Sequence, residues 1–184
     1  MGLPRPLVET IEAELGPIGA PVPVGGGDIS RAARVGLADG GDLLIKWHQN
    51  APIGMFSAER RGLALLRTAE ALRVPQVLLQ QEATERCPAF IALEWLGRGS
   101  GSGDVAAALG RGLARLHREV GPHFGLDHNN FIGANPQPNR PADNWISFFR
   151  DQRLAFQMEL AAKSGRLPRA RAQQLVKLLA RLDD

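Results

Sequence analysis

One stretch of sequence, LLIKWHQNAPIGMFSAERRGLALL at residues 43–66, constrains the fold more than any other part of the chain. Over residues 42–48, leucine, isoleucine and tryptophan alternate with a second set of side chains that includes Lys46, and this period of two predicts a β-strand. Pro52 and Gly54 then mark a turn. From Ser57 the apolar residues recur at helical spacing, which predicts a helix that carries Glu59 in its first turn.

Lys46 and Glu59 are candidates for an ion pair that holds a nucleotide. In phosphotransferases of the protein-kinase type, a strand lysine contacts the nucleotide phosphates and a helix glutamate keeps it in place. Glu59 shares one side of its helix with Leu63, Leu66 and Glu70, so we expect it to face a buried cation. The alternatives are an exposed strand lysine and an exposed glutamate favoured by the helix dipole.

Three consecutive glycines, Gly25, Gly26 and Gly27, lie between two short β-forming runs within residues 22–35. Glycine tolerates positive φ and lets the backbone approach phosphate oxygens closely, so this loop is a candidate to cover a nucleotide. A glycine-rich hairpin turn that binds nothing is the alternative. The position of the loop just before the lysine strand favours nucleotide binding.

Composition limits the classes of partner and compartment. The 184 residues suffice for one domain or two small lobes, and 44% of them are hydrophobic, enough to form a core. A formal charge of +3 suits an anionic ligand such as ATP and is too small to indicate nucleic acid. The single cysteine, Cys87, favours a reducing compartment. Without a signal-peptide pattern or a membrane-spanning stretch, we expect a cytoplasmic protein with no membrane partner.

The remaining pattern predicts an α+β chain in two lobes. Residues 7–15 have the spacing of an amphipathic helix, and residues 74–79 and 89–96 have the composition of two more strands. Small, flexible residues follow, so we place a hinge at 94–103 between an amino-terminal lobe of residues 1–93 and a partial helical lobe of residues 104–184. An apolar stripe after Asp104 predicts a core-facing helix: Val105, Leu109, Leu113, Leu116 and Val120.

Residues 121–143 are rich in Gly, Pro and Asn, and their interleaved apolar side chains predict a packed loop. Asp127, His128 and Asn129 resemble pieces of a kinase catalytic loop. The sequence lacks a His-x-Asp followed by Asn at the required spacing, so we assign no catalytic residue. A helix is predicted from Asn144 to Leu160, and a last helix near Pro168.

Together these motifs resemble the fructosamine and ketosamine 3-kinases, a branch of the protein-kinase-like fold related to aminoglycoside and choline kinases. The resemblance runs through GGGDIS, LLIKW, MFSAERRGLALL, LEWL and LGRGLARLH, and it is most specific in FGLDHNNFIGANPQPN and DNWISFFRDQRL. It implies an enzyme that uses ATP and Mg²⁺ to phosphorylate the sugar 3-hydroxyl of ketosamines. The substrate would be a small ketosamine or a glycated protein, and the outcome would be deglycation.

The resemblance also implies roles for individual residues. Gly25, Gly26 and Gly27 would cover the phosphates, while Lys46 would contact them and pair with Glu59. Leu93 would lie at the back of the adenine pocket. The backbone of Glu94 and Leu96 would bond the adenine edge.

Two features depart from the family pattern. Asp28 stands where some members have a cysteine, so redox control through that thiol is not expected. The family's His-Gly-Asp-Leu-Trp-x-Gly-Asn loop and its metal-binding Asp-Pro do not occur in the sequence, and with them go the acceptor-orienting aspartate and the Mg²⁺ ligands. We therefore expect this chain to represent the amino-terminal portion of such a kinase and to be inactive or nearly so by itself.

Two alternatives stay open at this point. The first is a short pseudokinase-like module that binds a nucleotide or a partner without chemistry. The second is a phosphotransferase of the same fold that acts on a small alcohol of the choline or aminoglycoside type, although the loop from Phe124 to Pro138 favours the ketosamine branch.

Overall fold

The structure is a computed structural model that describes residues 2–25, 29–97, 99 and 103–182. It divides into two compact units, residues 1–119 and residues 120–184, which are described separately. The two units combine helices with antiparallel sheets, as the α+β prediction requires. Among the described residues, no helix has the length and apolar character to cross a membrane.

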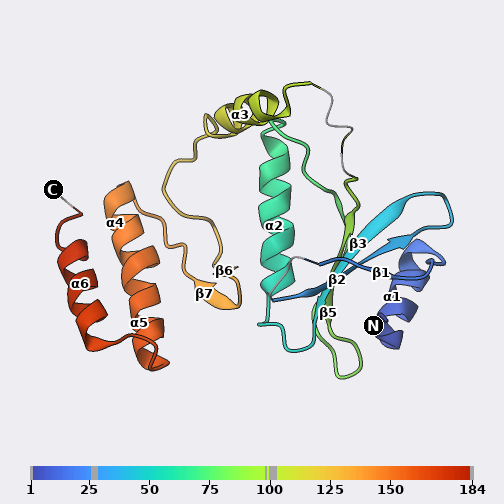
Figure 1. Cartoon of the computed structure of the whole chain (residues 1–184), viewed down its shortest axis with the longest axis horizontal. Helices are drawn as coiled ribbons and strands as arrows, with labels where there is room; N and C mark the ends of the chain where they lie inside the picture. The colour runs from blue at the N-terminus through green and yellow to red at the C-terminus, as the bar shows by residue number, and fades with distance from the viewer. Residues whose placement is uncertain (1, 26–28, 98, 100–102, 183–184) are drawn as a thin grey trace. The chain divides into compact units, whose positions relative to one another are not determined.

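The first unit is built on a five-stranded antiparallel sheet with strand order β1-β2-β3-β5-β4 (Figure 1). The strands are β1 (Val22–Pro23), β2 (Arg31–Gly36), β3 (Asp42–His48), β4 (Val77–Gln81) and β5 (Ala89–Glu94). The predicted lysine strand is thus the middle strand of the sheet, where Lys46 pairs with Ala32 on one side and Ile91 on the other.

Helices cover the two faces of this sheet, α1 (Arg5–Leu15) on one and α2 (Met55–Thr68) on the other (Figure 1). Against α1 lies a core that includes Leu7, Ile11, Ile45 and Trp47, all at most 5% exposed. Against α2 lies a second core: Phe56, Ala89, Ile91 and Leu93, with Leu44 and Leu63 packed at its edge. The alternation predicted for residues 42–48 is therefore correct, because Leu43, Ile45 and Trp47 enter the core beneath α1, whereas Leu44 packs against the core beneath α2.

Cys87 belongs to the core beneath α1. Its side chain is 5% exposed, and burial raises the pKa of the thiol, although a hydrogen bond with Thr10 partly offsets this effect. The thiol is therefore protonated and shielded in the folded unit.

Helix α2 begins two residues earlier than expected, so Glu59 lies in its second turn. Gly54 precedes the helix with φ +81°, and its N–H donates to the Glu82 carboxylate at 3.0 Å. Leu66 shares the side of α2 that carries Glu59, as predicted, but it is 41% exposed; the predicted alignment of Glu70 is wrong, because Glu70 lies beyond the helix with φ +47°. Helical periodicity alone does not locate the end of a helix, and this one ends at Thr68.

Helix α3 (Val105–Leu116) also belongs to the first unit, and Asp104 caps it as predicted, because Ala107 N donates to Asp104 Oδ1 at 2.9 Å. The apolar stripe of α3 was expected to face a core, and this is wrong in the first unit, since three of its residues are exposed by 38% or more: Val105, Leu109 and Leu113. The residue that α3 buries is Gly112, which lies against Ala71 and Leu72 after α2. Helix α3 therefore belongs to the same compact unit as the five-stranded sheet. The division into two lobes with a hinge at residues 94–103 stays a prediction.

The second unit begins with a small hairpin in place of the expected irregular loop. Strands β6 (Asn130–Ile132) and β7 (Asn135–Gln137) pair antiparallel, and Gly133 turns between them at φ +64°. Asn139, 2% exposed, closes the hairpin: its Nδ2 donates to His128 O and to Asn130 Oδ1, each at 2.9 Å. Buried amide groups of this kind must be fully paired, and they fix the fold of the loop.

Four helical segments complete the second unit: α4 (Trp145–Phe149), the π-helix η1 (Arg150–Ala155), α5 (Phe156–Lys163) and α6 (Arg169–Leu179). The single helix predicted for residues 144–160 is therefore correct in position but contains a π-helical turn. That turn presents Arg153 to the hairpin, where its Nη1 donates to Pro138 O at 2.6 Å and its Nη2 to Asn139 Oδ1. Phe148 is buried beneath the Arg153 guanidinium, whereas Trp145 is 51% exposed.

Candidate nucleotide-binding site

Lys46 and Glu59 form a direct ion pair in the structure. Lys46 Nζ donates to both carboxylate oxygens of Glu59, at 2.6 and 2.8 Å. The strand aims Lys46 at the face that α2 covers, and Glu59 descends from the second turn of α2 to meet it. The predicted pairing is confirmed as geometry.

The ion pair is partly exposed, and the expectation of a fully buried cation is wrong in this respect. The side chain of Lys46 is 29% exposed and that of Glu59 is 26% exposed. The exposure follows from the position of the pair at the edge of the core made by Phe56, Ile91 and Leu93. A cation held by one carboxylate and open to solvent can also attract the phosphates of a ligand.

The glycine loop is described only in part. Gly25 is exposed and follows Val24, whose N–H donates to Ala32 O at 3.0 Å across the two strands. A Cβ added to Gly25 would meet no atom within 4 Å, so the space around it is open. Gly26, Gly27 and Asp28 lie outside the described residues.

Leu93, Glu94 and Leu96 lie where β5 ends. Leu93 is 4% exposed and packs in the core beneath α2, on the face of the sheet that also carries Lys46. Glu94 is the last residue of β5, and Leu96 follows at intermediate exposure. Their assigned contacts with adenine stay a prediction.

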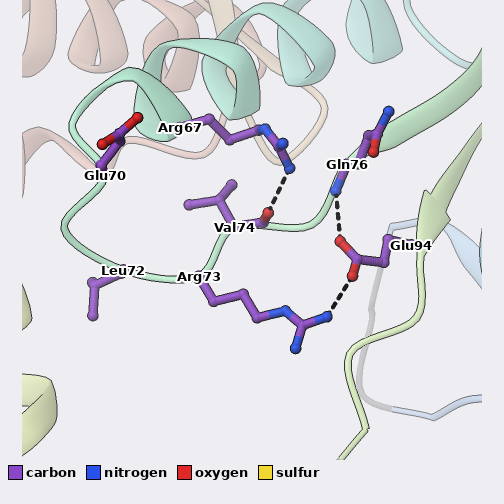
Figure 2. A pocket seen from close by; sticks show the side chains of 7 residues that line it. All are labelled: Arg67, Glu70, Leu72, Arg73, Val74, Gln76 and Glu94. Carbon is purple, nitrogen blue, oxygen red and sulfur yellow. Dashed lines mark hydrogen bonds and ion pairs between the residues drawn. The ribbon is translucent and has the colours of Figure 1, made fainter.

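The Glu94 carboxylate is held by the segment that follows α2 (Figure 2). Arg73 Nη2 donates to Glu94 Oε1 at 2.5 Å, and Gln76 N donates to Glu94 Oε2 at 3.2 Å. The Arg73 hydrogen bond is the main cause that lowers the pKa of Glu94 below its ordinary value, and the Gln76 N–H adds to it. These contacts lie in an open groove of about 480 Å³ whose lining also includes Arg67, Glu70 and Leu72.

The sequence analysis did not predict that Arg73 and Gln76 hold the Glu94 carboxylate or that Glu82 binds the start of α2. Each acts on a partner 18 to 28 residues away in the chain, through loops whose course the hydrophobic pattern does not specify. Polar side chains just after α2 and β4 were the available signal, because residues at the ends of elements commonly cap or brace a neighbouring element.

The residues present suit a nucleotide better than a metal ion. Lys46 offers a cation to phosphates, and the end of β5 offers backbone groups to a base. Within the part of the chain that the structure describes, no group of three or more His, Cys, Asp or Glu side chains could hold a metal ion.

An antiparallel sheet whose middle strand offers a lysine to a glutamate of the covering helix is the architecture of the amino-terminal lobe of kinase-like phosphotransferases. Comparison with known proteins gives the same class. The model of the fructosamine kinase family matches residues 9–183.

Individual relatives agree with the family match. A "Probable ketoamine kinase" of Synechocystis is 36% identical over 135 residues, which are 72% of this chain and 45% of that protein. The chloroplastic protein-ribulosamine 3-kinase of Arabidopsis thaliana is 32% identical over 140 residues, or 75% of this chain and 42% of that protein. The crystal structure of a candidate fructosamine-3-kinase from Thermobifida fusca is similar with a TM-score of 0.80 and 28% identity, and the match covers 96% of this chain and 61% of that one.

The chain belongs to the fructosamine kinase family, and it has the α+β, kinase-like fold of that family. It spans about half the length of the curated relatives that it matches.

Proposed function

We propose that this chain supplies the ATP-binding part of a ketosamine 3-kinase, an enzyme that phosphorylates the sugar 3-hydroxyl of ketosamines and so promotes deglycation. The observation that carries the proposal is the Lys46–Glu59 ion pair on the covered face of the sheet. The family match supplies the reaction class. The substrate would be a small ketosamine or a glycated protein, in the cytoplasm.

The proposed contacts follow from the hydrogen bonds around the site. Glu94 N–H donates to Gln76 O at 2.8 Å, and Trp95 N–H donates to Asp42 O at 3.0 Å, so these two amides are occupied within the protein. The resemblance to kinase-like phosphotransferases gives adenine recognition to the backbone of Glu94 and Leu96. With the Glu94 and Trp95 amides occupied, we propose the Glu94 carbonyl and the Leu96 amide as the groups that bind the base. Lys46 would hold the α/β-phosphates, with Glu59 fixing its position, beneath the loop of Gly25, Gly26 and Gly27.

Binding of ATP to the 184-residue chain tests this proposal. We expect ATP to shift the backbone ¹H–¹⁵N signals of Leu96 and of residues around Lys46, and Lys46→Met to weaken binding about tenfold or more because a charge-assisted contact is lost. Lys177→Met, which removes an exposed charge from α6, is the matched control. Absence of any ATP-dependent shift in the wild-type chain would refute the proposal.

We propose catalysis only for a protein that has all the catalytic and metal-binding residues of the family, and not for these 184 residues alone. The sequence contains no His-Gly-Asp motif to orient an acceptor hydroxyl, and phosphoryl transfer depends on such positioning and on metal ions. We expect no phosphorylation of a ribulosamine by these 184 residues with ATP and Mg²⁺. Turnover in that assay would contradict this part of the proposal.

A binding module without chemistry is the second candidate function, because the Lys46–Glu59 ion pair would hold a nucleotide whether or not phosphoryl transfer follows. Restoring a carboxy-terminal segment from a relative of the family distinguishes the two. Recovered ribulosamine phosphorylation supports the kinase, whereas nucleotide binding without turnover supports the module. Activity on choline or an aminoglycoside instead would identify a small-alcohol phosphotransferase.

A further inference from the structure

The end of β5 is braced from the side of α2. The Glu94 carboxylate accepts hydrogen bonds from Arg73 and from Gln76 N–H, while Glu94 N–H donates to Gln76 O (Figure 2). Residues 73–76 therefore hold both the side chain and the backbone of the residue whose carbonyl we assign to adenine.

The bracing segment is itself attached to α2. Arg67, in the last turn of that helix, donates from Nη1 to Val74 O at 3.1 Å. A short loop joins the two, in which Glu70 adopts φ +47°, a conformation that non-glycine residues rarely adopt and that the surrounding contacts must hold. A continuous set of contacts thus runs from the helix that carries Glu59 to the end of β5.

The opposite side of the same strand end is also braced. The Arg34 guanidinium lies 5.4 Å from the centre of the Trp95 ring, and its Nη2 donates to Asp42 Oδ2 at 2.5 Å. Trp95 N–H in turn bonds Asp42 O. Arg34 and Arg73 therefore contact the end of β5 through different partners, Trp95 and Glu94.

We infer that Arg73 is a positioning residue for adenine recognition, acting through Glu94 to fix the carbonyl that accepts the adenine 6-amino group. The inference rests on the proposed function, since it concerns the base-binding half of that site. A carbonyl fixed in this position favours adenine over guanine, because guanine presents an oxygen at position 6 and two acceptors would face each other.

A merely structural role for Arg73 gives a different expectation. Its side chain is 76% exposed, and an exposed ion pair adds little to the stability of a fold. Arg73→Met should therefore fold, and its effect should appear in the choice of base. A structural role would leave that choice unchanged.

Titration of the full 184-residue chain with ATP and with GTP, followed by ¹H–¹⁵N NMR, tests the inference. For Arg73→Met we expect the ATP-to-GTP affinity ratio to fall about tenfold, because the loss of one well-placed hydrogen bond changes affinity by about that factor. Arg73→Lys should keep part of the preference, since an ammonium can still reach the carboxylate.

Two variants serve as controls. Arg61→Met removes an exposed arginine of α2 that plays no part in this set of contacts, so the ratio should hold. Glu59→Gln should weaken ATP and GTP equally, because its partner Lys46 is assigned to the phosphates. A ratio that is unchanged in Arg73→Met while the wild-type chain binds ATP would overturn this inference alone. A wild-type chain that binds neither nucleotide would overturn the proposed function and this inference with it.

Discussion

Ser57 Oγ donates a hydrogen bond to Glu82 Oε1 at 2.7 Å, so the first turn of α2 is tied to the residue that follows β4. The other carboxylate oxygen of Glu82 accepts from Gly54 N–H at 3.0 Å, at the start of the same helix. A carboxylate at a helix amino terminus satisfies free N–H groups and interacts favourably with the helix dipole. Glu82 therefore fixes the turn that leads to Glu59.

Replacing Glu82 should destabilise the first unit. For Glu82→Ala we expect the free energy of unfolding to fall by about 1–2 kcal/mol, because two donors at the start of α2 lose their acceptor. Urea denaturation, followed by the NMR signals of residues 31–94, measures the change. Glu85→Ala, an exposed carboxylate in the following turn, is the control and should change stability by less than about 0.5 kcal/mol. Equal effects of the two substitutions would refute the capping role.

Two glycines of α3 should respond in opposite directions to alanine. A Cβ on Gly112 would lie 2.2 Å from Leu72 Cδ2 and 3.1 Å from Ala71 O, whereas a Cβ on Gly110 would meet nothing within 4 Å. Gly110→Ala should stabilise the helix by about 0.5–1 kcal/mol. Gly112→Ala should destabilise by about 1–2 kcal/mol, because the Leu72 side chain must shift and the nearby Ala71 carbonyl leaves little room, which outweighs the gain in helix propensity. Thermal unfolding of both variants gives the comparison, and stabilisation by Gly112→Ala would contradict the packing of α3.

A second glycine pair tests the hairpin unit. Gly125 has φ +122°, and a Cβ there would lie 2.9 Å from Asn139 O and 3.2 Å from Arg140 O. Gly125→Ala should cost about 3 kcal/mol, since strain and backbone overlap add. Gly165, at φ +68° with open space around it, should tolerate alanine at about 1 kcal/mol. Hydrogen exchange of residues 124–142 reads out the difference, and similar protection in both variants would count against the assigned contacts.

The Arg73–Glu94 contact should depend on pH. The pKa of Glu94 is lowered in the folded chain, mainly by the hydrogen bond from Arg73 and also by the hydrogen bond from Gln76 N–H. The unfolded chain then binds the proton more tightly, so the contact contributes to stability above the ordinary glutamate pKa and is lost as pH falls through the lowered value. Side-chain ¹³C NMR of Glu94 should show that Arg73→Met moves its pKa back up towards the ordinary value. An unmoved titration would mean that Arg73 does not hold the carboxylate in solution.

The Lys46–Glu59 contact was predictable because two local periods define it. A period of two places Lys46 on one face of a strand, and a helix shortly after it must cover that face to bury its own leucines. How deeply the pair is buried was not predictable, because exposure depends on what surrounds it in space. The supports Arg73 and Glu82 escaped prediction for the same reason.

The stripe of α3 shows a different limit of the pattern. Val105, Leu109 and Leu113 give a clear apolar side, yet in the first unit that side is exposed and Gly112 makes the close contact. Periodicity reports that a helix has an apolar face, not which element covers it. The β6–β7 hairpin was missed because Asn, Pro and Gln are poor strand formers, and a network of amide hydrogen bonds, centred on Asn139, holds it instead.

The π-turn at Arg150–Ala155 has a consequence for comparing relatives. A π-turn contains about one residue more than the α-turn it replaces. Deleting one residue there would restore regular α-helix and leave the later side chains of α5 near their present faces, because the π-turn fits its extra residue into about one turn. Two homologues that differ by such a deletion would therefore present similar surfaces of this helix to their neighbours, whereas the same deletion in regular α-helix would rotate every later side chain by about 100°.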